Sequence, residues 1–194
     1  MKNLFGNLLL LAVIAAVVSF FAAPAVAFFG IRSAADANDV AGLSRLIDFS
    51  AVRQSLWPQL SGNPAAMAPA PTFLEDPIGA VRRRFEPTDA AAAADADAYL
   101  TPAALAGLTR GDGRYASQRS ARPDGGSARS PLPAPVFWGV NRARMAITDE
   151  GGSRTIFTFE RKGPFEWRLV HIGLPEGAAP AVPAPAAPAP VARP

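Results

Sequence analysis

The sequence predicts an α+β protein in which N-terminal helices pack on a C-terminal antiparallel β-meander. Apolar residues recur at helical spacing from residue 29 to residue 60. After residue 142 the apolar residues alternate with polar ones in three segments, which glycine-containing turns separate. Because an apolar helix stripe and an apolar sheet face must both be covered, we expect the helices to lie against one face of the sheet.

The N-terminal segment is apolar and uncharged. No charged side chain lies between Lys2 and Arg32, and the intervening stretch is rich in Leu, Val, Ala and Phe. A basic start, an apolar segment and the small residues Ala25 and Ala27 are typical of a signal peptide that is cut after Ala27. We expect Pro24 to end the apolar helix just before that position, because proline lacks a backbone donor.

The same segment is long enough to anchor the chain in a membrane. A transmembrane helix needs about 20 apolar residues, and residues 8–29 supply that length. Residues 1–27 therefore form either a cleaved signal peptide or a retained membrane anchor, and both alternatives stay open. With Lys2 on the cytoplasmic side, both place the rest of the chain outside the cytoplasm. We expect a bacterial protein that is periplasmic, or anchored in the inner membrane and facing the periplasm.

The helical region from residue 29 to residue 60 contains two expected breaks. Asn38-Asp39 offers an interruption followed by a new N-cap, and Asp48 offers a second N-cap. Pro58 lies late in this region and is expected to shorten or bend the last helix.

Further along the chain, an N-cap residue followed by proline predicts two more helix starts. These are Asp76-Pro77 and Thr101-Pro102, and the second helix should end near Gly111. Residues 110–135 combine glycine, serine and proline with five arginines, so we expect a flexible loop. The loop is either simply solvated or binds an anionic lipid or envelope polymer.

Three strands are predicted in the last third of the chain. Turns at Glu150–Gly152 and Lys162–Pro164 separate them. The apolar content of the last strand suggests that it is central or covered on both sides. The residues expected on one face of the three strands are Ala143, Met145 and Ile147, then Thr155, Phe157 and Phe159, then Trp167, Leu169 and His171.

Composition limits the domain organisation and the chemistry. We expect one folded domain over residues 28–175 and a disordered, extended Ala/Pro-rich tail over residues 176–194. The absence of cysteine excludes thiol catalysis, and a single histidine, His171, excludes a multi-histidine metal site. The net charge is +3, and no aromatic–basic pattern accompanies it. We therefore expect neither a cofactor nor a nucleic-acid partner.

Two parts of the chain carry a family resemblance. One comprises Ile31–Ala35, Asn38-Asp39, Leu43–Phe49 and Val52–Leu56, and the other is the strand Trp167–Pro175. Together they resemble an uncharacterised bacterial envelope family that is known only as a domain of unknown function. The resemblance implies an apolar N-terminal segment, helices and a late β-meander, and it implies no catalytic residue. Helices followed by a curved antiparallel sheet are also similar to the cone-shaped nuclear-transport-factor-like fold, from which no function follows.

Three functional hypotheses remain. The first is a non-enzymatic envelope scaffold that holds an unknown envelope partner or an anionic surface. The second is a binder of an apolar small molecule in a pocket between helices and sheet, and the third is an isomerase-like enzyme that uses Asp48 or His171. We expect Asp48 to cap a helix and Arg53 to pair with it locally. The candidate pocket residues are Asp48, Arg53, Met145, Phe157, Trp167 and His171.

Overall fold

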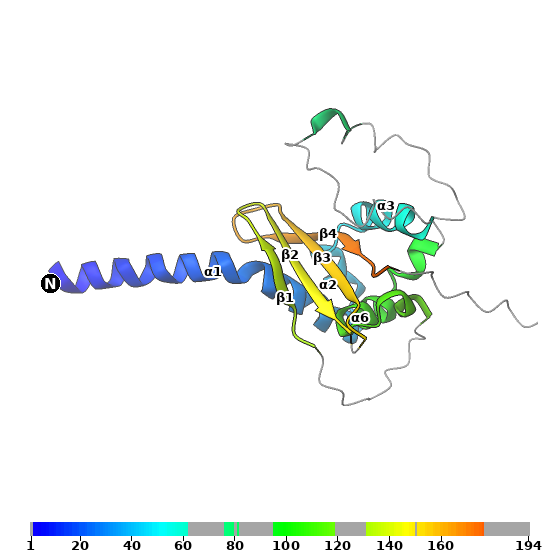
Figure 1. The fold of residues 1–194 in the computed structure, drawn as a ribbon. Helices are drawn as coiled ribbons and strands as arrows, with labels where there is room; N and C mark the ends of the chain where they lie inside the picture. The colour runs from blue at the N-terminus through cyan, green and yellow to red at the C-terminus, as the bar shows by residue number, and fades with distance from the viewer. Residues whose placement is uncertain are drawn as a thin grey trace, which may run out of the picture.

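The computed structural model is an α+β fold in which helices pack against a four-stranded antiparallel sheet of order β1-β2-β3-β4 (Figure 1). It describes residues 2–61, 76–79, 81, 95–118, 131–149 and 151–176. The predicted fold class is therefore confirmed, with one strand more than the three expected. The helices are α1 (Lys2–Asp36), α2 (Val40–Leu46), α3 (Phe49–Leu60), α6 (Pro102–Arg110) and the 3-10 helix η2 (Gly113–Gln118). The strands are β1 (Ala134–Trp138), β2 (Arg142–Thr148), β3 (Arg154–Arg161) and β4 (Trp167–Gly173).

Helix α1 is continuous over 35 residues, and its apolar N-terminal part projects away from the domain (Figure 1). The expectation that Pro24 ends this helix is wrong. Proline removes only one backbone donor, and Pro24 is itself buried where α1 packs on the domain. Packing therefore stabilises the helix through this position.

The predicted helix caps are confirmed. Asn38 has φ +54° and ends the turn after α1, while the Asp39 carboxylate accepts the Gly42 N–H at 2.9 Å at the start of α2. The hydroxyl of Thr101 caps α6 in the same way, and Gly111 ends that helix at φ +99°. Asp76 accepts the Gly79 N–H at 2.8 Å, so the third predicted start is present, although the rest of that predicted helix lies outside the described residues.

The core lies between the second half of α1 and one face of the sheet. Phe28 is fully buried, and its ring meets that of Phe157 edge to face with centroids 5.2 Å apart. Arg32, one turn further along α1, donates to the carbonyls of Thr109 and Pro131 and lies over the Phe28 ring. Helix α1 thus holds the sheet, α6 and the segment that leads into β1.

The alternation predicted for the first two of the three segments, now β2 and β3, is confirmed, and that of the last segment, β4, is wrong in part. Met145 pairs with Phe157 in register. In β4, Phe159 pairs with Leu169 but Thr158 pairs with His171, so Val170 forms a bulge. Because a bulge adds one residue, it reverses the faces of the residues that follow. His171 therefore lies on the face opposite to Leu169.

Strand β4 is an edge strand of the sheet, and α3 borders its outer edge. The contact begins at the start of α3, where the Asp48 N–H donates to the Leu169 carbonyl at 2.9 Å. The Gln59 side-chain amide donates to the Ile172 carbonyl at 2.8 Å and accepts from the Leu174 N–H at 2.9 Å. The last strand is therefore not the central strand that its apolar content suggested, and a helix rather than a further strand borders its outer edge.

The segment expected as a loop over residues 110–135 is partly ordered. Arg110 ends α6 and pairs with Asp36 at 2.6 Å. Helix η2 follows, and the Tyr99 hydroxyl donates to the Arg114 carbonyl at 2.7 Å. Strand β1 then begins at Ala134. Residues 119–130 of this predicted loop, and the predicted tail beyond Glu176, lie outside the described residues.

Candidate functional site

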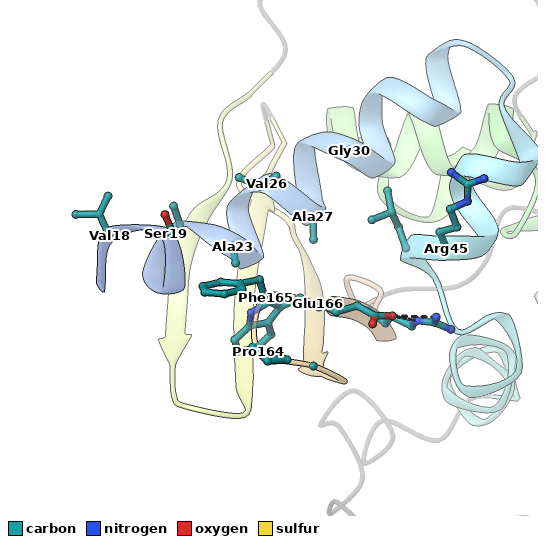
Figure 2. A pocket seen from close by; sticks show the side chains of 15 residues that line it. Val18, Ser19, Ala23, Val26, Ala27, Gly30, Arg45, Pro164, Phe165 and Glu166 are labelled. Atoms are coloured by element: carbon teal, nitrogen blue, oxygen red, sulfur yellow. Dashed lines mark hydrogen bonds and ion pairs between the residues drawn. The ribbon is translucent and has the colours of Figure 1, made fainter. Parts of the chain in front are cut away.

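An open apolar groove lies at the end of the domain from which α1 projects (Figure 2). It has a volume of about 1070 Å³ and is formed by α1, the end of α2, the turn between β3 and β4 and the first residues of β4. We call it the α1 groove. Its lining residues are Val18, Ser19, Ala22, Ala23, Val26, Ala27 and Gly30 of α1, Arg45 and Leu46 of α2, and Gly163–Arg168.

Small side chains on α1 produce the hollow. Ala22, Ala23 and Ala27 lie along the helix face that forms one wall. At Gly30 the helix approaches α2 so closely that an added Cβ would lie 3.0 Å from Leu46 Cδ1. The glycine thus lets α2 close one end of the groove, while the alanines keep the rest of it open.

The opposite wall is the turn between β3 and β4. The turn is closed by the N–H groups of Lys162 and Gly163, which donate to the Glu166 carbonyl at 2.9 and 3.3 Å. Phe165, at the tip, is 61% exposed and lies across from Ala23 (Figure 2). An exposed phenyl ring on a polar turn enlarges the apolar wall of the groove without contributing to the core.

The charged groups of the groove gather at its α2 end (Figure 2). Arg168 pairs with Glu166, with Nη2 2.9 Å from Oε1. Arg45 is exposed, and its side chain makes neither an ion pair nor a hydrogen bond with any described residue. Among the lining residues, two guanidinium groups thus face one carboxylate, and the ionised Asp48 carboxylate outside the lining also interacts with Arg168, so Arg45 carries the uncompensated charge.

Of the six residues predicted to line a pocket, Trp167 alone lines the α1 groove. Its ring is 2% exposed, at the base of the groove. Met145 and Phe157 are buried in the core, where Phe157 packs on Phe28. The apolar groove therefore shares only Trp167 with the pocket that the sequence predicted between helices and sheet.

Asp48 and Arg53 do not meet. The Asp48 carboxylate caps α3, accepting the Ser50 hydroxyl at 2.7 Å and the Ala51 N–H at 3.1 Å. Arg53 instead pairs with Asp97 at 2.6 Å. The expected local pair is wrong, because residues five apart on a helix do not share a face as residues three or four apart do.

The environment of Asp48 keeps its carboxylate ionised. Partial burial raises its pKa, but the hydrogen bonds from Ser50 and Ala51 and the charges of Lys162 and Arg168 outweigh that effect, so its pKa lies below the ordinary value. A general acid needs the opposite shift. Asp48 does not line the α1 groove, and its hydrogen bonds cap α3.

His171 is 4% exposed and lies within the sheet, opposite Thr158. It is not among the residues that line the α1 groove. Within the described ranges, no three His, Cys, Asp or Glu side chains come together as metal ligands.

Sequence reasoning missed Arg45, Phe165 and the alanines of α1. Ala27 was interpreted as part of a signal-peptide cleavage site, and Ala22 and Ala23 only as part of an apolar segment. A signal was present, because Ala23, Ala27 and Gly30 recur at intervals of four and three and mark one helix face as small. Phe165 was also visible as an aromatic residue inside a predicted turn.

Comparison with known proteins gives one match. Residues 13–108 match a family that is described as "Protein of unknown function (DUF2939)". The matched range contains the helical segments on which the envelope-family resemblance rests and ends before the sheet. No curated protein and no solved structure matches the chain. The likeness to the nuclear-transport-factor-like fold therefore stays a prediction, and the family match brings no activity.

Proposed function

We propose that this protein is a membrane-anchored, non-catalytic scaffold of the bacterial cell envelope, with its α+β domain held outside the cytoplasm by α1. One observation carries the proposal: a single unbroken helix contains both the apolar segment and part of the domain core. The family match over residues 13–108 is compatible with it, because the matched range joins the apolar segment to the helices of the domain.

The two halves of α1 differ in burial. The residues Gly6–Asp36 are long and apolar enough to cross a membrane, and only 6% of the most apolar window is buried. A core helix of a soluble protein would bury such a window. Further along, Ala27, Phe28 and Ile31 are 6%, 0% and 1% exposed. The exposed half therefore needs an apolar environment, and the buried half fixes the domain to it.

Continuity of α1 favours a retained anchor over a cleaved signal peptide. A cut after Ala27 would fall inside the helix, within the buried part. It would remove the helical acceptors for the N–H groups of residues 28–31, because each such group donates four residues back. A mature domain that began at Phe28 would thus start with an unsatisfied helix end beside its core.

A scaffold role follows from the rigid connection. No loop separates the apolar segment from the domain, so the orientation of the helix sets the orientation of the sheet. Lys2 on the cytoplasmic side directs the domain to the outer surface. The capping role of Asp48 and the placement of His171 within the sheet, both outside the α1 groove, support a non-catalytic protein.

The α1 groove favours binding of an apolar ligand as a second function. Its volume of about 1070 Å³ lies just above the range of about 300–1,000 Å³ that is usual for small-molecule sites. Such binding would accompany the scaffold role rather than replace it.

Intact mass of the membrane-extracted full chain tests the anchor. We expect a polypeptide that begins at Met1, remains in the membrane fraction after alkaline extraction, and keeps its mass when signal peptidase is inhibited. A secreted protein with a known cleaved signal, expressed in the same cells, serves as the control for active peptidase. A soluble periplasmic chain that begins at Phe28 would refute the proposal.

A further inference from the structure

The α1 groove crosses the level at which α1 leaves the membrane. A span of about 20 residues counted from Asn3 ends near Ala22, which lines the groove. The guanidinium of Arg161 lies 5.4 Å from the centre of the Phe20 ring, and a charged side chain there marks the headgroup level. Both markers agree, so Val18 lies within the outer leaflet and Gly30 lies outside it.

Apolar and charged groups follow one another along the groove in the same direction as in a lipid of that leaflet, with the apolar part deeper in the membrane. Its inner end is apolar, lined by Val18, Ala22 and Phe165, and its outer end carries Arg45 and Arg168. The distance along α1 from Val18 to Gly30 is about 18 Å at 1.5 Å per residue. One leaflet of hydrocarbon is about 15 Å deep. An acyl chain that follows the groove would leave the leaflet near Ala22, continue for about 12 Å along α1, and bring its headgroup to the arginines.

The neighbouring hairpin tips have the composition of a membrane interface. In an antiparallel meander the β1–β2 and β3–β4 turns lie at the same end of the sheet, the end nearest the projecting part of α1 (Figure 1). Phe137, Val140 and Phe165 are exposed there. Exposed apolar side chains, phenylalanine among them, are buried at the boundary between headgroups and acyl chains when a surface lies on a membrane. This end of the domain therefore faces the bilayer around the groove.

The charge at the outer end selects the headgroup. Glu166 already pairs with Arg168, whereas Arg45 makes no ion pair with a described residue. A phosphate that carries a net negative charge supplies the missing partner, since guanidinium groups bind phosphate through paired N–H donors. A zwitterionic headgroup would bring its own cation close to the Arg45 guanidinium.

From these observations we infer that the α1 groove binds one anionic phospholipid from the outer leaflet, with an acyl chain against α1 and Phe165 and the phosphate at Arg45 and Arg168. The inference rests on the proposed function, because the leaflet is reached only while α1 stays in the membrane.

Quenching of Trp167 fluorescence by brominated lipids tests this inference. The full chain carrying W57F and W138F, which leaves Trp167 as the tryptophan observed, is reconstituted into phosphatidylcholine vesicles. Equal minor fractions of brominated phosphatidylglycerol or brominated phosphatidylcholine are then compared. We expect about fivefold stronger apparent binding of the phosphatidylglycerol, which corresponds to about 1 kcal/mol for one arginine.

Two arginine variants make the test specific. R45Q removes an exposed arginine of the groove and should abolish the preference for phosphatidylglycerol. R154Q removes an equally exposed arginine at the other end of β3 and should keep it. Equal quenching by both lipids in a chain that begins at Met1 and stays in the vesicles would overturn the lipid site and leave the anchor intact. A chain that begins at Phe28 or leaves the vesicles would overturn the anchor, and the lipid site with it.

Discussion

Replacing Gln59 by leucine should destabilise the domain more than any change of similar size on the exposed face of α3. Gln59 is 3% exposed, and its amide joins α3 to the edge of β4. The N–H and C=O of one strand residue point to the same edge of the strand. The Ile172 C=O points to the outer edge of β4, toward α3 and away from β3. Without the amide, Ile172 and Leu174 each keep a buried backbone group that has lost its partner.

The expected cost follows from those two groups. A buried donor or acceptor without a partner costs about 1–3 kcal/mol, so the two groups together cost about 2–6 kcal/mol before any gain from burying the leucine side chain. A matched change is available on the same helix, because Gln54 is exposed. Q54L should change stability by less than about 0.5 kcal/mol, as surface substitutions usually do.

Urea unfolding of the full chain in a nonionic detergent, followed by tryptophan fluorescence, measures both variants. We expect the Q59L midpoint to fall well below that of wild type, and the slope of the transition to stay the same. If Q59L and Q54L unfolded within about 0.5 kcal/mol of each other, the amide would not hold the β4 edge, and the account of how α3 covers the sheet would be wrong.

Three other predictions concern single contacts. Arg32→Met should lower stability by about 2 kcal/mol in the same urea assay, because the Thr109 and Pro131 carbonyls lose a charged donor. Asp48→Ala should cost about 1 kcal/mol through loss of the α3 cap. The Asp48 pKa is lowered in the folded state, so the stability that its carboxylate contributes is present above the unfolded pKa of about 3.9 and is lost as the pH falls through the folded value. Urea midpoints measured across acidic pH should show that loss of stability in wild type and not in Asp48→Ala. Gly111→Ala should cost more than Gly152→Ala, since both have positive φ but only Gly111 would place a Cβ 3.3 Å from Ile147; equal thermal midpoints for the two variants would contradict this.

Local chemistry made most helix ends predictable from the sequence. Asp48 and Thr101 each cap the helix that was expected to begin after them. Gly111 ends α6 in the left-handed conformation that glycine adopts readily. These signals depend on side chains within three or four residues, so no tertiary information is needed to interpret them.

Strand β1 escaped prediction because it lacks the burial pattern of a half-buried strand. Its first four residues are exposed, and Pro135 lies within it. Proline is tolerated only at a sheet edge, where its missing donor has no partner to lose. Pairing with β2 therefore creates this strand, and the isolated segment resembles a loop. The Val170 bulge depends on a partner strand in the same way. Pairing with β3 determines which β4 residues lie on which face of the sheet, and the β4 sequence alone does not.

The α1 groove could not be predicted, because its walls meet only in the folded chain. Arg45 and Phe165 are separated by more than half of the sequence, and neither belongs to a motif. Only the α1 wall could be seen in advance, and there the apolar segment has two requirements at once. In the membrane anchor that we propose, residues up to Ala22 must suit lipid, whereas from Ala23 onward the same helix must pack on a domain and still leave a hollow. Alanine and glycine meet both requirements, since they are small enough for close packing and apolar enough for the interface. The segment that resembles a signal peptide in composition is therefore the segment that the domain uses as a wall.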